Sequence, residues 1–425
     1  MLVYQAESSA YLLRRRGRPR ASARTRLRVS RTVVLLGLTS LFTDVSSEMV
    51  AAVLPLYLVY SLGLTPLQFG VVDGLYQGAA ALVRLGSGFV GDRWRRHKEV
   101  AAIGYGLSAV TKLAFPVVGA AWTAISAAVL VDRTGKGIRT APRDALISLS
   151  SPREGLGMAF GVHRALDTAG AMLGPVVAFA LLTAAPDAFD SVFVVSFCFA
   201  LVGLSILMLF VHNQPIAAAP ERTADRPSLR AALGLLADPR FRTLVIVGGA
   251  LALATVSDGF VYLQLQRQIG FETSLLPLLY VGTALVYMLL AVPMGRLADR
   301  IGRARVFLAG YALLVLLYSS LLLPSQGIAQ LGVTLLLFGA YYAATDGVLM
   351  ALASAMLPEA LRGSGLALLV TATSVGRLLA SVLFGVLWTA AGAQTAVVAF
   401  AVALLAALAA AAVALARRGG GTVAA

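Results

Sequence analysis

Long apolar runs alternate with short polar connections along almost the whole chain. Most runs have about 20 residues or more, the length that an α-helix needs to cross the hydrocarbon core of a bilayer. The two-residue alternation of a membrane β-barrel is absent. The pattern therefore predicts an all-α polytopic membrane protein with twelve transmembrane helices, at residues 32–60, 69–91, 99–119, 121–147, 156–183, 190–212, 241–266, 273–297, 304–324, 328–356, 362–391 and 395–416.

Arginine distinguishes the two sides of these predicted helices. The connections that follow the even-numbered helices are rich in arginine, whereas the other connections carry almost none, apart from Arg267. By the positive-inside rule, the arginine-rich connections and both chain termini lie in the cytoplasm. Arginine outnumbers lysine 32 to 3 and alanine is abundant, a composition typical of a GC-rich bacterial genome. We therefore expect a multi-pass protein of a bacterial cytoplasmic membrane.

One polar connection divides the predicted helices into two groups of six. Residues 213–238 are rich in proline, alanine and charge, which is typical of a linker. This linker separates two predicted six-helix bundles, residues 32–212 and 239–416. Short tails remain at 1–31 and 417–425, both predicted to be cytoplasmic.

The first tail holds most of the excess positive charge. Residues 1–31 contain nine arginines and one acid, Glu7, which accounts for +8 of the net charge of +15. Such a tail can contact lipid or nucleic acid. A disordered cytoplasmic tail that follows the positive-inside rule is the simpler interpretation, so the bilayer is the expected partner and no nucleic acid is expected.

A short motif occurs once in each half, 207 residues apart. The first copy begins Gly88-Phe-Val-Gly-Asp92-Arg93, and the second begins Gly295-Arg-Leu-Ala-Asp299-Arg300. Both copies follow the second helix of their half. Internal duplication of six helices, with binding sites near the membrane midplane between the halves, is a transporter architecture. The repeat thus predicts two pseudo-symmetric bundles.

These copies resemble the G-x-x-x-D-R-x-G-R-R/K loop of the major facilitator superfamily, although Arg95 replaces the second glycine in the first copy. The resemblance implies the superfamily's fold and an alternating-access transporter. An acid at a helix end, followed by bases, can pair with neighbouring helix ends in one conformation and release them in another. The predicted conformational gate comprises Gly88, Asp92, Arg93, Arg96, Gly295, Asp299, Arg300, Gly302 and Arg303.

The fifth predicted helix contains Gly170-Ala-Met-Leu-Gly174-Pro175. This segment resembles the G-x-x-x-G-P element of the export branches of the superfamily, which include the drug/proton antiporters. Glycines four residues apart let two helices approach closely, and proline adds a kink. We therefore predict a helix hinge at Gly170, Gly174 and Pro175.

Two acids on the first predicted helix are candidates for proton coupling. Asp44 and Glu48 are four residues apart and share one helix face. Asp44 lies about 18 Å into the helix, near the membrane midplane. A charge there costs roughly 2.5–3.5 kcal/mol unless it faces a polar cavity or a partner. In some multidrug antiporters that this chain resembles, acids in this part of the first helix couple transport to protons.

The fourth predicted helix is the most charged and leaves two interpretations open. Arg133-Thr-Gly-Lys136-Gly is similar to the superfamily's R-x-x-Q-G pattern, which places Arg133 in the cavity. Charge density favours a different face of this helix as the one that lines the cavity. That face is a stripe within about 60° that comprises Asp132, Lys136, Arg139 and Arg143. Arg139 and Arg143 fit a cytoplasmic helix end equally well, so Arg133 and Lys136 are predicted to meet Asp44 and Glu48.

Other intramembrane charges are secondary candidates for the transport pathway: Asp167, Asp258, Asp346 and Arg377. The three histidines are not clustered, so no metal site is predicted. Gly135-Lys136-Gly137 lacks the spacer of a phosphate-binding P-loop, which removes support for ATP-driven transport. No cofactor is expected, with the proton as the coupling ion.

These observations predict a monomeric secondary transporter that exports small molecules in exchange for protons. Because the fourth helix is net positive, a proton symporter or an exporter of anionic solutes is the alternative. A membrane enzyme or a lipid scramblase is a further alternative. We disfavour the enzyme because the sequence places no nucleophile–base pair or metal cluster at either face.

Overall fold

The computed structural model describes residues 29–94, 96–152, 155–213, 233–324, 327–358 and 361–419, without the side chains of 84–94 and 418–419. All regular elements in these ranges are helices, which confirms the predicted all-α fold. The predicted tail at 1–31 and the linker at 213–238 lie mostly outside the described residues, as does the end of the tail at 417–425. So do the side chains of the predicted gate residues Asp92 and Arg93 and the surroundings of Gly88.

The first half contains six long helices. Helix α2 starts soon after the described chain begins and ends in a π-helical turn, η2 (Tyr57–Ser61). The helices are α2 (Arg31–Leu56), α3 (Pro66–Trp94), α4 (His97–Val118), α5 (Trp122–Leu149), α6 (Leu156–Ala184) and α7 (Phe189–Phe210).

The second half contains six spans, of which the first is divided into two helices. Short 3₁₀ turns, η4 (Leu235–Ala237) and η5 (Thr273–Leu275), precede α9 and α11. The helices are α9 (Pro239–Leu253), α10 (Asp258–Ile269), α11 (Leu276–Ile301), α12 (Arg303–Leu322), α13 (Ile328–Met356), α14 (Arg362–Ala391) and α15 (Ala393–Gly419).

Ten of these spans are long and apolar enough to cross a membrane by length and composition alone. The remaining two, α3 and α5, are also of membrane-spanning length, at 29 and 28 residues. Helix α5 carries six charged residues, so its place in the bilayer depends on how those charges are paired.

The break between α9 and α10 differs from the continuous helix predicted over 241–266. Residues 254–257 leave the helical path although they include no glycine or proline. The buried Tyr318 hydroxyl accepts a hydrogen bond from the Val256 amide at 2.7 Å and donates one to the Ala254 carbonyl at 3.1 Å. A side chain from α12 therefore satisfies backbone groups that would otherwise be left unpaired inside the bundle.

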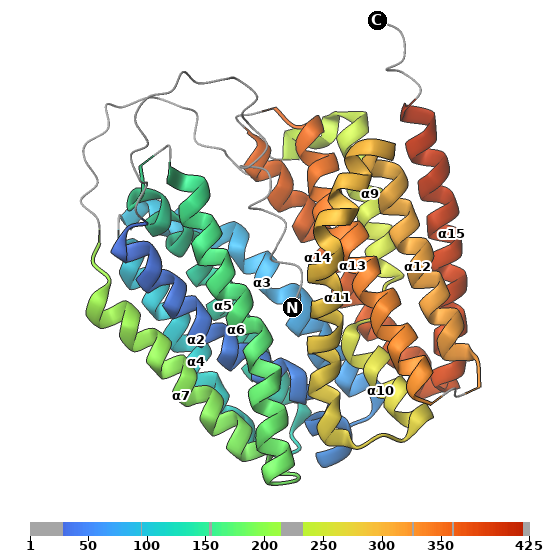
Figure 1. Ribbon diagram of the computed structural model, residues 1–425, viewed down its shortest axis with the longest axis horizontal. Helices are drawn as coiled ribbons and strands as arrows, with labels where there is room; N and C mark the ends of the chain where they lie inside the picture. Colours follow the sequence, from blue (N-terminus) through green and yellow to red (C-terminus); the bar gives the residue numbers. More distant parts are fainter. Residues whose placement is uncertain are drawn as a thin grey trace, which may run out of the picture.

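Each half packs as its own bundle (Figure 1). In the first bundle α2 lies against α6 and α7, and α5 lies against α3 and α4. In the second, α13 contacts α11 and α12, and α14 contacts α9. Glycine permits the closest of these contacts, since a Cβ atom at Gly170 would lie 2.3 Å from the Leu41 carbonyl oxygen. Gly174 approaches the Val45 carbonyl of α2 in the same way.

The two bundles meet through α3 and α14 at the arginine-poor end of the helices. The Leu67 amide donates a hydrogen bond to the Thr389 hydroxyl at 3.0 Å. The Tyr60 hydroxyl also donates to the side chain of Gln266. In Figure 1 the bundles lean together at the end where α10 lies. In this conformation the two halves are therefore in contact at the arginine-poor end.

Candidate functional site

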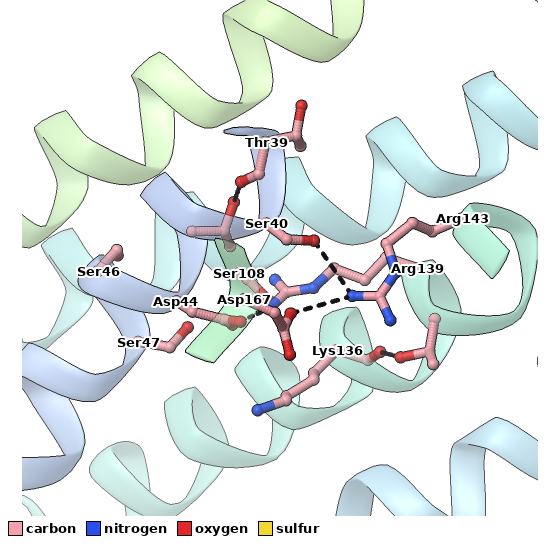
Figure 2. Close-up of polar contacts among 12 residues, drawn as sticks. Thr39, Ser40, Asp44, Ser46, Ser47, Ser108, Lys136, Arg139, Arg143 and Asp167 are labelled. Atoms are coloured by element: carbon pink, nitrogen blue, oxygen red, sulfur yellow. Dashed lines mark hydrogen bonds and ion pairs between the residues drawn. The ribbon is translucent and has the colours of Figure 1, made fainter. Parts of the chain in front are cut away.

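The first bundle contains a network of charged side chains from α2, α5 and α6 (Figure 2). Asp44 of α2 faces Arg139 of α5, with 3.9 Å between a carboxylate oxygen and a guanidinium nitrogen. Asp167 of α6 lies within hydrogen-bonding reach of the Asp44 carboxyl group, and the charge of Lys136 also acts on Asp44. Asp44, Asp167 and Arg139 therefore meet among three helices, with Lys136 nearby on α5.

Arg143 ties this network together one turn further along α5. Its guanidinium donates to Asp144 at 3.0 Å and to the Ser40 hydroxyl at 3.3 Å. It also lies 3.7 Å from Asp167, which forms a second ion pair with Arg164 at 3.2 Å. Asp167 is thus held between two arginines while it faces Asp44.

A second cluster lies where α5 packs against α4 and α3. The Lys112 ammonium donates to Asp132 at 2.7 Å, and the Arg133 guanidinium donates to the other oxygen of the same carboxylate. Arg133 also lies over the Tyr76 ring, 3.7 Å from its centroid. All three charged side chains are nearly fully buried. Each of these buried charges has an oppositely charged partner, as expected for a cluster that stabilises the bundle.

The structure separates the two acids that share a face of α2. Glu48 is 4% exposed and packs beside Gly174 of α6, where its charge acts on Arg133 and Tyr76. Asp44 faces the other network and is 14% exposed. The expected meeting of both acids with Arg133 and Lys136 is therefore divided between two clusters.

Arg139 is the ion-pair partner that sequence reasoning did not single out. Its guanidinium contacts Asp44 and lies over the Tyr105 ring, 4.6 Å from the centroid. The Arg139 side chain is 3% exposed, so it is buried inside the bundle and does not extend to the cytoplasmic end of the helix. The stripe that joins Arg139 to Lys136 and Arg143 was the available signal, because those residues share a face of α5.

The second bundle holds a simpler pair between α13 and α14. Asp346 and Arg377 are 3.4 Å apart, and one oxygen of Asp346 and the Nε of Arg377 are buried without a hydrogen-bond partner among the described residues. Both line a cavity of about 30 Å³. This space fits about two water molecules, which can satisfy those atoms. The other lining residues include Ala252, Phe307, Tyr311, Thr345, Leu349, Met350, Val370 and Thr373.

Asp258 lies at the start of α10, immediately after the break in the seventh span. It is buried and accepts a hydrogen bond from the Tyr342 hydroxyl of α13. A half-helix that begins inside the bundle directs its amide groups toward this point, which favours a carboxylate there. Asp258, a secondary pathway candidate, is therefore held in place by the hydrogen bond from Tyr342. It is not a member of the Asp346–Arg377 ion pair.

The second copy of the repeated motif is described in full. Asp299 pairs with Arg303 at 3.0 Å, and Arg303 also donates to the Ala351 carbonyl at the end of α13. Gly302 adopts a φ of +106°, a conformation that glycine permits and other residues rarely adopt. Gly295 and Arg300 lie on the last turns of α11 beside this pair. In the first copy, Arg96 is exposed at the start of α4.

The predicted hinge lies in a helix that remains continuous. Helix α6 runs from Leu156 to Ala184 with Pro175 buried inside it. Gly170 and Gly174 lie where α6 is closest to α2, so they set the distance between the helices that carry Asp44 and Asp167. Whether α6 bends at this segment stays a prediction.

Comparison with known proteins places the chain in a family. The sequence model of the Major Facilitator Superfamily matches residues 36–286 and 259–423, so the chain belongs to this superfamily. It is a multi-pass membrane transporter of that type. An uncharacterized MFS-type transporter of Methanocaldococcus jannaschii is 30% identical over 371 residues, which cover 85% of this chain and 89% of that protein.

Solved transporters share the fold at low sequence identity. A variant of the nucleoside transporter NupG superposes with a TM-score of 0.77. It is 15% identical in sequence, and the superposition covers 90% of this chain and 99% of that transporter. A bacterial homologue of the human lysosomal transporter Spinster gives 0.71 at 15% identity, over 90% and 96%. These likenesses confirm the predicted fold. The assignment to the drug/proton antiporter branch stays a prediction.

Proposed function

We propose that this protein exports small molecules in exchange for protons, with Asp44 as the coupling acid. The observation that supports this role is the position of Asp44 between Asp167 and Arg139, on three different helices. Asp44 and Asp167 are 14% and 15% exposed, so water can reach both carboxyl groups. Asp144 of the same network is more exposed, at 34%, but Asp44 and Asp167 are the two acids that face each other between helices.

The chemistry follows from two carboxyl groups that lie close together. Two negative charges at such a distance repel strongly, so a proton shared by the pair stabilises it. When that proton leaves, Asp44 attracts the Arg139 guanidinium more strongly. Proton binding and release therefore move a cation on α5 relative to α2 and α6. We propose that a positively charged or polar substrate competes with the proton for Asp44.

The proposed cycle uses the orientation predicted by the arginines. The positive-inside rule places the arginine-poor end outside the cell, so the conformation described above is closed to the outside. Protons that enter from the outside would reach Asp44 in the opposite conformation. The bundles would then rock about the site, with the Asp299–Arg303 pair and its counterpart near Asp92 as the cytoplasmic gate.

Export of anionic solutes is the second candidate, and one observation favours it. Lys136, Arg139, Arg143 and Arg164 outnumber Asp44, Asp144 and Asp167 in and around the network. An anion would bind the bases and leave the carboxyl groups to titrate. The charge class of the substrate therefore decides between the two candidates.

The test is a substrate panel in everted membrane vesicles loaded with a pH-sensitive dye. The panel contains lipophilic cations, organic anions, nucleosides and sugars. We expect one class to cause a saturable, protein-dependent loss of the proton gradient. Asp44→Asn combined with Glu48→Gln should abolish that response without reducing expression. A cation response supports the main proposal, and an anion response supports the alternative.

Asp190→Asn provides the matched control. Asp190 is an exposed acid in the first turn of α7, outside the network, and undergoes the same chemical change. Its response should equal that of the unmodified protein. Undiminished transport in the Asp44/Glu48 double variant would overturn the coupling role of these acids.

A further inference from the structure

The contact between the bundles contains a carboxyl group that the proposed coupling network does not use. Asp73 of α3 is 9% exposed and accepts a hydrogen bond from the Ser381 hydroxyl of α14 at 2.6 Å. These residues are 308 positions apart and belong to different halves of the chain. The bond therefore exists only while the two bundles are together at this end.

The seam around this bond, defined as the contact of α3 residues 66–78 with α14 residues 374–389, is tightly closed. A Cβ atom at Gly70 would lie 2.5 Å from the Ser381 carbonyl oxygen, and one at Gly74 would lie 2.8 Å from that of Leu378. On the facing helix, Gly385 approaches the Pro66 carbonyl equally closely. Water is thus excluded from the surroundings of Asp73 while the seam is closed.

The groups that face Asp73 supply no compensating positive charge. Among the described residues Asp73 forms no ion pair, and the charge of Asp258 on α10 acts on it across the seam. Tyr280 of α11 is also near, and Tyr342 of α13 is bound to Asp258. On α5 the base is Arg133, which stacks on Tyr76 one turn along α3 and is already paired with Asp132.

An ionised carboxylate in this position is unfavourable for two reasons. Burial removes its hydration, and a hydroxyl donor offsets only part of that cost. A second carboxylate across the seam adds repulsion between the halves. A neutral carboxyl group avoids both costs and still accepts the Ser381 hydrogen bond. Opening the seam would return Asp73 to water, where the charged form is favoured.

We propose that Asp73 is a proton-binding gate residue: with its proton bound the α3–α14 seam closes, and its ionisation opens the seam. Two further hydrogen bonds that join the bundles in the described part of the chain, Leu67–Thr389 and Tyr60–Gln266, link groups that stay neutral. Acid on the arginine-poor side would therefore favour closure of that side. This gate is distinct from Asp44, and it operates whether or not Asp44 couples transport.

The experiment measures the seam directly in the full-length protein in lipid nanodiscs. Spin labels are attached through Ser61→Cys and Gln394→Cys, two exposed positions on either side of the seam, in a Cys198→Ala background. Distances are recorded by pulsed electron paramagnetic resonance from about pH 5 to pH 9. We expect the closed-to-open ratio to fall with rising pH, by at most about tenfold per pH unit, the limit for one proton.

Variants assign the response to Asp73. Asp73→Asn keeps the shape and the hydrogen-bond acceptor, so its seam should stay closed at every pH. Ser381→Ala should lower the closed fraction in acid and keep the pH response. Asp190→Asn, the exposed control, should behave like the labelled parent protein.

Three results would overturn the inference. The first is a distance distribution in the parent protein that does not change over this pH range, which needs no variant to interpret. The second is an unaltered pH response in Asp73→Asn, and the third concerns Asp44. If Asp44→Asn alone removed the response, the titration would belong to the coupling network. That outcome would reject the Asp73 gate and leave the proposed function standing.

Discussion

The two bundles place an ion pair between equivalent helices but reverse its polarity. In the first bundle the base, Arg143, is on α5 and the acid, Asp167, is on α6. In the second bundle the acid, Asp346, is on α13 and the base, Arg377, is on α14. The sequence repeat relates α5 to α13 and α6 to α14. The equivalent helices thus carry the acid and the base in opposite order, although the repeat does not align the individual residues.

The surroundings of the two pairs differ more than the pairs themselves. Arg143 and Asp167 share their charges with Ser40, Asp144 and Arg164. Asp346 and Arg377 form no further ion pair among the described residues, and they border a water-sized cavity with Tyr311, while Tyr341 and Tyr342 lie near Arg377. A network can redistribute charge when a proton arrives, whereas an isolated pair can only open or close. This difference supports the proposal that the first bundle couples protons.

The largest expected effect is a loss of folding free energy at Asp132, which pairs with both Lys112 and Arg133, compared with the loss at Asp346, which pairs with Arg377. Asp132→Asn leaves Lys112 and Arg133 buried without their shared counter-ion, so it should cost about 3–5 kcal/mol of folding free energy. Asp346→Asn leaves only Arg377, and should cost about 1–3 kcal/mol. Thermal and denaturant unfolding of purified protein in detergent measure both. Equal losses would mean that Asp132 is no more structural than Asp346.

Charge exchange within each pair should give an intermediate effect. Asp346→Arg with Arg377→Asp keeps the one ion pair, so the double variant should recover most of the stability lost in either single variant. Arg143→Asp with Asp167→Arg should recover little, because Ser40, Asp144 and Arg164 remain placed for the original charges. The coupling energy from the Asp346–Arg377 cycle should be about 0.5–3 kcal/mol, as for contacting residues, and that from the Arg143–Asp167 cycle should be smaller.

This comparison of cycles has a clear contrary result. If the Arg143–Asp167 exchange recovers as much stability as the Asp346–Arg377 exchange, the first bundle contains a simple pair. The proposed redistribution of charge would then lose its basis. Yield and monodispersity of each purified variant serve as controls for folding.

The smallest effect on stability is expected at the cytoplasmic gate. Asp299 and Arg303 form an exposed pair, and such pairs contribute less than about 1 kcal/mol. Asp299→Asn should therefore leave the unfolding midpoint nearly unchanged. It should lower the transport rate more than the apparent affinity for the substrate that the vesicle panel identifies. A pure loss of affinity would argue against a gating role.

Much of the fold could be predicted from the sequence because hydropathy and helix periodicity are local. Apolar runs of membrane-spanning length indicated the helices, and the repeated motif indicated the two halves. Asp44 and Glu48 could be placed on one face, since four residues make about one helical turn. The break at 254–257 could not be predicted, because it depends on Tyr318 from another helix.

The candidate site shows the same division between local and distant information. Periodicity placed Lys136, Arg139 and Arg143 on one stripe, but could not say which of them would pair with Asp44. That choice depends on how α5 packs against α2, where Arg143 contacts Ser40 instead. Arg139 therefore became the partner of Asp44 only in the folded bundle.

The sequence by itself determined the class of protein: a twelve-span transporter built from two repeats, with charges buried in its membrane helices. These properties depend on composition, spacing and helical pitch, which need no tertiary contact. Only the tertiary structure decided which charges meet, where the seventh span breaks, and that Asp73 lies across the seam from Ser381. Such contacts join residues far apart in the chain, and their distances depend on how whole helices pack.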